Sequence, residues 1–164
     1  MCRFRLIIFV GITVFFIPEL FGQHKLSLEN YFVKKSDLIV IGTVTNMTSK
    51  WDENKKNIYT YVTVKCIDCL KGKKLKVITI KVAGGIVGEV GIEITTAEKY
   101  TISEKIFAFL KKNSDGTYSV IAARDGKYTY KGANIINSHE MILHDHTFID
   151  SINQMIVKQK SYSK

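Results

Sequence analysis

Three histidines with acidic neighbours form the densest group of possible metal ligands in the chain. They are His139, His144 and His146, with Glu140 and Asp145 between them in the run HEMILHDH. Residues two apart share a face in an extended segment, so His144 and His146 could bind one ion there. A zinc-protease helix needs two histidines four residues apart, whereas His139 and His144 are five apart. We therefore expect solvated histidines and no cofactor, with a small exported metal-dependent hydrolase as the alternative.

Cys66 and Cys69 form a C-x-x-C pair, which in an exported protein suggests a disulfide or redox motif. A thioredoxin-type motif places its first cysteine at a helix N-terminus, whereas we expect Cys66 at the end of a strand. A zinc site of this type needs a second pair, which the sequence lacks. Two interpretations stay open: Cys66 is a small core residue, or the two cysteines are bridged.

Aromatic and basic residues gather around one predicted hairpin. They could stack on sugar rings or hold an acidic partner peptide. The alternative is that the tryptophan, the only one in the chain, pins the hairpin while the tyrosines cover a strand. The candidate surface consists of Trp51, Lys55, Lys56, Tyr59, Tyr61 and Lys65. Neither paired carboxylates nor a nucleophile elbow stands out, so we expect no catalytic residues.

These side chains would be positioned by a meander of three strands between residues 36 and 82. The run Leu38–Ile41 is continuously apolar, and the polar stretch 52–57 predicts a hairpin loop. From Ile58 the alternation places one set of residues inward and leaves Tyr59, Tyr61 and Lys65 outward. The residues expected inward are Thr60, Val62, Val64, Cys66, Ile78, Ile80 and Val82.

Further elements are expected on either side of this meander. A short helix over 27–35 has Ser27 as its cap and Leu28, Tyr31 and Phe32 as its apolar side. The glycine-rich stretch 83–91 indicates a sharp barrel corner rather than a phosphate-binding loop. Later segments read as a buried strand over 106–110, a tight turn over 113–116, a strand over 118–122 and a C-terminal helix over 147–158.

The N-terminus has the layout of a secretory signal peptide. Arg3 and Arg5 precede an apolar stretch over 6–17, Pro18 breaks it, and Gly22 offers a cleavage point. We predict a signal peptide over 1–22, with an uncleaved anchor as the alternative, and no membrane span after cleavage. Residues 23–164 would form a single domain of roughly 140 residues with a basic tail. The protein is then secreted, periplasmic or attached to the cell envelope.

The net charge indicates which classes of binding partner to expect. It is +9 at pH 7 and falls to +8 when Arg3, Arg5 and Glu19 leave with the signal peptide. Outside the cytoplasm nucleic acid is not an expected target, whereas an anionic glycan, a lipid head group or an acidic protein is. The alternative is that scattered lysines only keep the sheet soluble and guard its edges. The sequence does not predict the oligomeric state.

The order of these segments resembles the OB-type barrel of the netrin-like modules, which include the tissue inhibitors of metalloproteinases. The likeness covers residues 26–130 and is carried by SDLIVIGTV, IYTYVTV, VITIKV and EKIFAFLKK. It implies a mainly β fold, a five-stranded OB-like Greek-key barrel with short N- and C-terminal helices. Those inhibitors chelate the protease zinc through an N-terminal cysteine, whereas Gln23-His24 opens the predicted mature chain, and the family's disulfides are also missing.

From these features we expect an exported, non-catalytic binding or interaction module. Its barrel surface would bind a protein or an anionic envelope ligand. The alternatives are the metal-dependent hydrolase described above and a structural component of the envelope without a small ligand.

Overall fold

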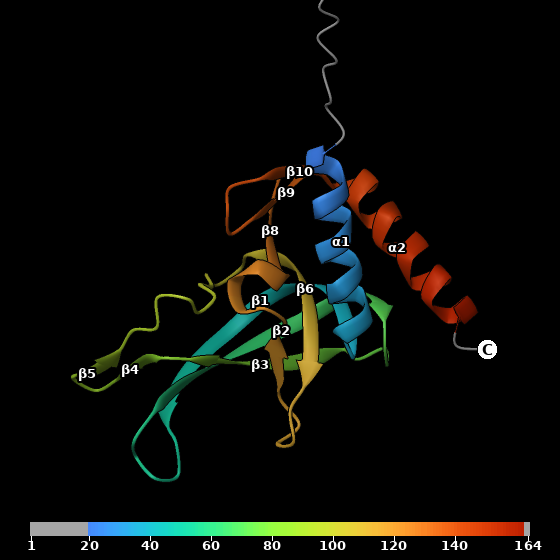
Figure 1. Ribbon diagram of the computed structural model, residues 1–164. Helices are drawn as coiled ribbons and strands as arrows, with labels where there is room; N and C mark the ends of the chain where they lie inside the picture. The colour runs from blue at the N-terminus through green and yellow to red at the C-terminus, as the bar shows by residue number, and fades with distance from the viewer. Residues whose placement is uncertain (1–19, 163–164) are drawn as a thin grey trace, which may run out of the picture.

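The computed structural model describes residues 20–162, with side chains over 28–161, and the predicted signal peptide falls almost entirely outside them. Two helices and ten strands make up this part of the chain, together with one short 3-10 helix (Figure 1). The elements are α1 (Leu20–Lys35), β1 (Leu38–Trp51), β2 (Ile58–Lys71), β3 (Val77–Ala83), β4 (Gly85–Val87), β5 (Val90–Ile92), β6 (Lys105–Lys112), β7 (Tyr118–Val120), η1 (Ala123–Gly126), β8 (Lys127–Lys131), β9 (Asn134–Asn137), β10 (Ile142–His144) and α2 (Asp145–Tyr162).

Five strands close into a barrel, as the sequence predicted. The order is β1-β2-β3-β7-β6, and β6 pairs back onto β1. All neighbours are antiparallel except β3 and β7, which run parallel and meet at the single position Ile80 opposite Tyr118. This order, in which the third strand neighbours the last one, is that of a Greek-key barrel with OB-like connectivity. The sheet then continues from β6 through β8, β9 and β10.

The continuous apolar runs of β1 and β6 are explained by burial on both faces. Leu38 and Val40 point into the barrel, whereas Ile39 and Ile41 point outward under the helices. In β6, Phe107 and Phe109 also face the helices, where Phe107 packs edge-on against Phe148 of α2 at a centroid distance of 5.0 Å. The domain therefore has two cores, one inside the barrel and one between barrel and helices. The barrel core contains the expected inward residues Val62, Val64, Ile78, Ile80 and Val82.

The N-terminal helix differs from its prediction in both start and orientation. It begins at Leu20, so Ser27 lies inside it and is not its cap. Its buried side chains are Glu29, Phe32 and Val33, whereas Leu28 and Tyr31 are about half exposed. The helix therefore rolls relative to the predicted apolar side, because the aromatic surface of β6 receives Phe32, whose ring centroid lies 5.5 Å from that of Phe109.

The glycine-rich stretch is not a barrel corner but a separate two-stranded arm, β4 and β5. Gly88, with φ 60°, supplies the left-handed backbone of its turn. Figure 1 shows this arm reaching out on the side of the barrel away from both helices. The C-terminal helix was predicted correctly as an amphipathic helix and begins two residues earlier, at Asp145. Among residues 20–162, neither helix is long and apolar enough to cross a membrane.

Candidate functional site

The outward face of β2 and β3 carries two tyrosines with a lysine between them. Tyr61 lies directly opposite Lys81 in the antiparallel pair, and Tyr59 lies opposite Ala83. The Lys81 Nζ atom is 4.5 Å from the centroid of the Tyr59 ring and 6.0 Å from that of Tyr61. Both rings are partly exposed, so the face offers aromatic surface and a cation to an approaching molecule.

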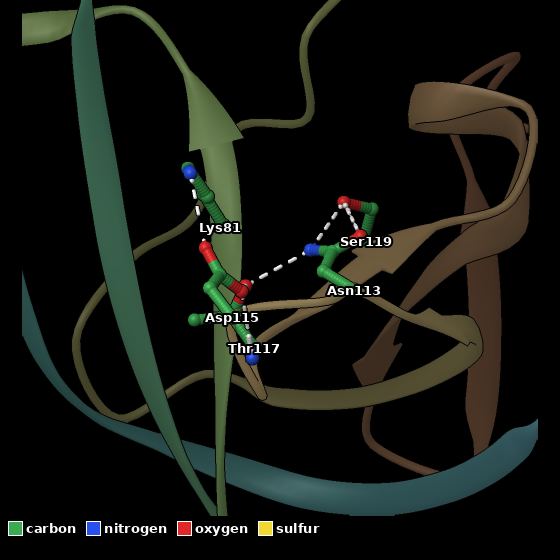
Figure 2. Close-up of polar contacts among 5 residues, drawn as sticks. All are labelled: Lys81, Asn113, Asp115, Thr117 and Ser119. Atoms are coloured by element: carbon green, nitrogen blue, oxygen red, sulfur yellow. Dashed lines mark hydrogen bonds and ion pairs between the residues drawn. The ribbon is translucent and has the colours of Figure 1, made fainter. Parts of the chain in front are cut away.

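The turn between β6 and β7 fixes the position of this lysine. Asp115 Oδ2 accepts a hydrogen bond from Lys81 Nζ at 3.1 Å, as Figure 2 shows. The other carboxylate oxygen accepts from the Thr117 hydroxyl at 2.6 Å and from the Thr117 backbone N–H at 3.0 Å. Hydrogen bonds from Thr117 and then from Lys81 lower the pKa of Asp115 to about 2, and Asp115 raises the pKa of Lys81. Both charges are therefore present at neutral pH.

A second pair of polar side chains stiffens the same turn. Asn113 Nδ2 donates to Thr117 Oγ1 at 2.9 Å and to Ser119 Oγ at 3.0 Å (Figure 2). Lys81, Tyr59 and Asp115 line an open depression of about 520 Å³ together with residues of the segment 94–98. The sequence thus folds into a polar rim, braced by hydrogen bonds, beside a strip of aromatic side chains.

Trp51 does not belong to this face. In the register of β1 and β2, Trp51 is opposite Ile58, and Lys50 is opposite Tyr59. Directly paired residues share a face, so Trp51 lies on the side of the buried Ile58 and away from Tyr59 and Tyr61. The residues of the predicted surface therefore lie on two faces of the sheet, and Lys50 is the β1 residue opposite Tyr59.

The three predicted lysines are all exposed at different ends of the face. Lys55 and Lys56 occupy the hairpin loop, which Asp52 orders by accepting from the Lys56 backbone N–H at 2.7 Å. Lys65 is exposed near the other end of β2, opposite Val77.

The segment from His139 to His146 is not one extended strand, which a shared face for His144 and His146 would require. His144 ends β10, and the chain enters α2 at Asp145, so that the expected common face of His144 and His146 is wrong. Asp145 accepts a hydrogen bond from the Tyr130 hydroxyl at 3.0 Å, and His139 Nε2 lies 3.0 Å from Asp125 Oδ1. Within residues 28–161, no three side chains of His, Cys, Asp or Glu are grouped to hold a metal.

Cys66 and Cys69 both pack against the barrel core as free thiols. They lie inside β2, which runs on to Lys71, rather than at the end of a strand. The register of β1 against β2 shifts by one residue between them, so that Ile67 bulges out while both thiols face the core. Burial raises the pKa of each thiol, which disfavours the reactive thiolate.

Sequence reasoning missed Lys81, Asp115 and Asn113 as parts of the site. Ile80 and Val82 were expected to point inward, which leaves Lys81 between them on the outer face, and residues 113–116 were expected to form a turn; both expectations are confirmed. The contact between Lys81 and Asp115 arises because β3 and β7 are parallel neighbours. The predicted OB-like strand order could have indicated this contact. No known protein-family description matches this chain, and no curated protein sequence matches it.

Proposed function

We propose that this protein is a non-catalytic binding module that holds an anionic carbohydrate on the outward face of β2 and β3. The observation that carries the proposal is the Tyr59–Tyr61 strip with Lys81 between the rings, braced by Asp115. Tyrosine rings stack on the apolar faces of sugars, and ammonium groups bind their carboxylate or sulfate substituents.

The position of the strip within the fold supports the same function. In OB-type barrels the second and third strands, with the loops at positions corresponding to 52–57 and 113–117 here, form the ligand face. This support is an analogy of fold, and the side chains described above supply the chemistry. Export of the chain and its resemblance to netrin-like modules remain predictions that agree with an extracytoplasmic glycan as ligand.

Charge alone also draws a basic protein to any polyanion, so the test must separate stacking from charge. Tyr59→Ala/Tyr61→Ala leaves the net charge unchanged and should weaken binding to polygalacturonate about tenfold in calorimetry, since each ring contact contributes about 0.5–1.5 kcal/mol. Tyr31→Ala removes a more exposed tyrosine on α1, on the other side of the barrel, and should bind as wild type does.

A second comparison tests the lysines. Lys55→Ala/Lys56→Ala should weaken polygalacturonate binding more than Lys73→Ala/Lys74→Ala, which removes the same charge from the turn between β2 and β3. Equal losses from both pairs, together with unchanged binding by the double tyrosine variant, would reduce the interaction to charge attraction and refute the proposal. If the protein binds an acidic peptide more tightly than polygalacturonate, the ligand is an acidic protein and not a glycan.

A further inference from the structure

The last part of β1 has one edge that pairs with no other strand in the described part of the chain. On one side, β2 pairs with β1 as far as Trp51. On the other side, β6 pairs only with residues 38–43, and the segment before β6 adds two hydrogen bonds to Val44. Beyond the register shift at Thr45, this side of β1 is therefore an open sheet edge over residues 46–51.

The hydrogen bonds of the hairpin show which backbone groups face the open edge. The Asp52 N–H donates to the Asn57 carbonyl at 2.8 Å, so Asp52 faces β2. Hydrogen-bonded residues alternate along an antiparallel pair, so every second residue before Asp52 also faces β2. In agreement, the Ile58 carbonyl opposite Trp51 accepts from the Gly84 N–H on the β3 side, at 2.8 Å. The N–H and C=O groups that point to the open edge are those of Met47, Ser49 and Trp51.

The side chains along this edge leave it accessible to an added strand. Met47 packs against the barrel core from the inner side, and Trp51 is only partly buried. Lys50, on the outer face, is the only charged residue over 46–51, and the stretch contains no proline. Proteins usually protect an exposed edge with proline or with charged side chains that point inward. Neither protects this edge, and exposed edges bind extended peptides as additional strands.

Two observations argue against a second copy of this chain as the added strand. Two copies can pair all their edge-facing residues only in an antiparallel register centred on Ser49, about a twofold axis. β4 crosses the inner side of the sheet at this same residue, because a Cβ on Gly85 would lie 2.5 Å from Ser49 Oγ. The arms of two copies would therefore meet at the axis. Each chain also carries a net charge of +9, which opposes self-association.

We propose that the open edge of β1 binds an extended segment of another protein as an added antiparallel strand. Every second residue of that segment lies on the inner side, beside Met47 and Trp51, where apolar side chains fit. The residues between them lie on the outer side, and the position opposite Lys50 favours a carboxylate. This inference goes beyond the glycan site, because backbone groups of β1 carry it and the rings of Tyr59 and Tyr61 do not.

The experiment uses a capped synthetic peptide, Thr-Val-Glu-Val-Thr-Val-Thr, whose binding is measured by calorimetry. In the expected register the valine N–H groups point to β1, and the threonine and glutamate N–H groups point to solvent. N-methylation of the valines should therefore weaken binding about tenfold or more, whereas N-methylation of the other residues should leave it within about twofold. Equal binding of the two methylated peptides would overturn the proposal, because a strand pairs through one edge only.

The protein variants test the same edge from the other side. Ser49→Pro removes an N–H that faces the open edge and should weaken peptide binding about tenfold. Ser49→Ala is its matched control: both variants lose the contact of the Ser49 hydroxyl with that of Thr60, but the alanine keeps the N–H and should bind as wild type does. Equal binding by these two variants would refute the proposal.

A charge exchange provides a test that does not depend on proline. Lys50→Glu should bind the peptide about threefold more weakly and should prefer the version with lysine in place of glutamate. No change in preference would contradict the register.

The remaining comparison separates this site from the tyrosine strip and from self-association. Tyr59→Ala/Tyr61→Ala should bind the peptide as wild type does, even where it loses polygalacturonate. Loss of the peptide by this variant would place the peptide on the strip and overturn the inference. A dimer in analytical ultracentrifugation that Ser49→Pro dissociates would also overturn it, since the added strand would then be a second copy.

Discussion

Lys127 and Glu104 form an ion pair inside the domain, with 2.9 Å between Nζ and Oε1 and side chains only 9% and 13% exposed. The same lysine donates to the Lys99 carbonyl, and Glu104 also accepts from the Thr101 backbone N–H at 3.0 Å. This pair ties the loop that follows the arm to β8 at the side of the barrel.

Removing one partner of this ion pair should destabilise the protein strongly. Lys127→Met leaves the Glu104 carboxylate buried without its counter-ion, at an expected cost of about 3–5 kcal/mol in the free energy of unfolding. Lys127→Met/Glu104→Leu removes both charges and should recover much of that loss. Urea denaturation followed by circular dichroism measures both, and a single variant within about 1 kcal/mol of wild type would contradict the assigned burial.

Asp115 should remain ionised to strongly acidic pH. Its pKa of about 2 lies below its unfolded value, so its contribution to stability is complete above the unfolded pKa and is lost as the pH falls through about 2. The Thr117 hydroxyl is the first cause of the shift and Lys81 is a further one, so Thr117→Val and Lys81→Met should each raise the Asp115 pKa. NMR titration of the Asp115 carboxyl carbon measures the midpoint, and an unchanged midpoint in either variant would refute this assignment.

Gly42 in β1 should not tolerate a side chain. A Cβ there would lie 2.5 Å from Val64 Cγ1 and 2.8 Å from the Lys65 carbonyl oxygen, and the latter is backbone that cannot easily move. Gly42→Ala should therefore cost about 1–3 kcal/mol in thermal or urea unfolding. Gly91→Ala provides the matched control in a strand, because its nearest contact would be an ordinary 3.6 Å, and equal losses in both variants would argue against the close approach at Gly42.

Cys66 and Cys69 should react slowly with alkylating reagents in the native protein. Desolvation raises the pKa of both thiols above its ordinary value, so few thiolates exist at pH 7.5. Iodoacetamide labelling followed by peptide mass spectrometry should show slow modification of both, and fast modification in urea. Rapid native labelling, or a mass 2 Da lower that marks a disulfide, would contradict two shielded free thiols.

The barrel could be predicted because inward and outward residues alternate along the strands in the sequence, and the structure keeps this alternation. Val62 and Val64 face the core while Tyr59 and Tyr61 face outward, and the apolar runs of β1 and β6 reflect burial on both sides. The arm was missed although its signal was present: Gly88-Glu89 between β-branched residues is a two-residue hairpin turn with glycine first.

Other features depend on contacts that local patterns do not encode. Trp51 was grouped with Tyr59 and Tyr61 in one candidate surface, and its place on the other face of the sheet depends on the register of β1 against β2 across the hairpin. The pairing of Lys81 with Asp115 joins residues 34 positions apart and requires the strand order of the closed barrel. The roll of α1 was set by the aromatic surface of β6, which a helical pattern alone does not reveal.

The barrel is closed between β3 and β7 by one paired position, whereas every other contact between neighbouring barrel strands spans at least three. The ion pair between Lys81 and Asp115 crosses this same thin seam. Under the proposed function, an anionic ligand would compete with Asp115 for the Lys81 ammonium group. Binding of that ligand would then weaken the ion pair that crosses the β3–β7 contact. Amide hydrogen exchange in β7 should therefore become faster when such a ligand is bound on the outer face.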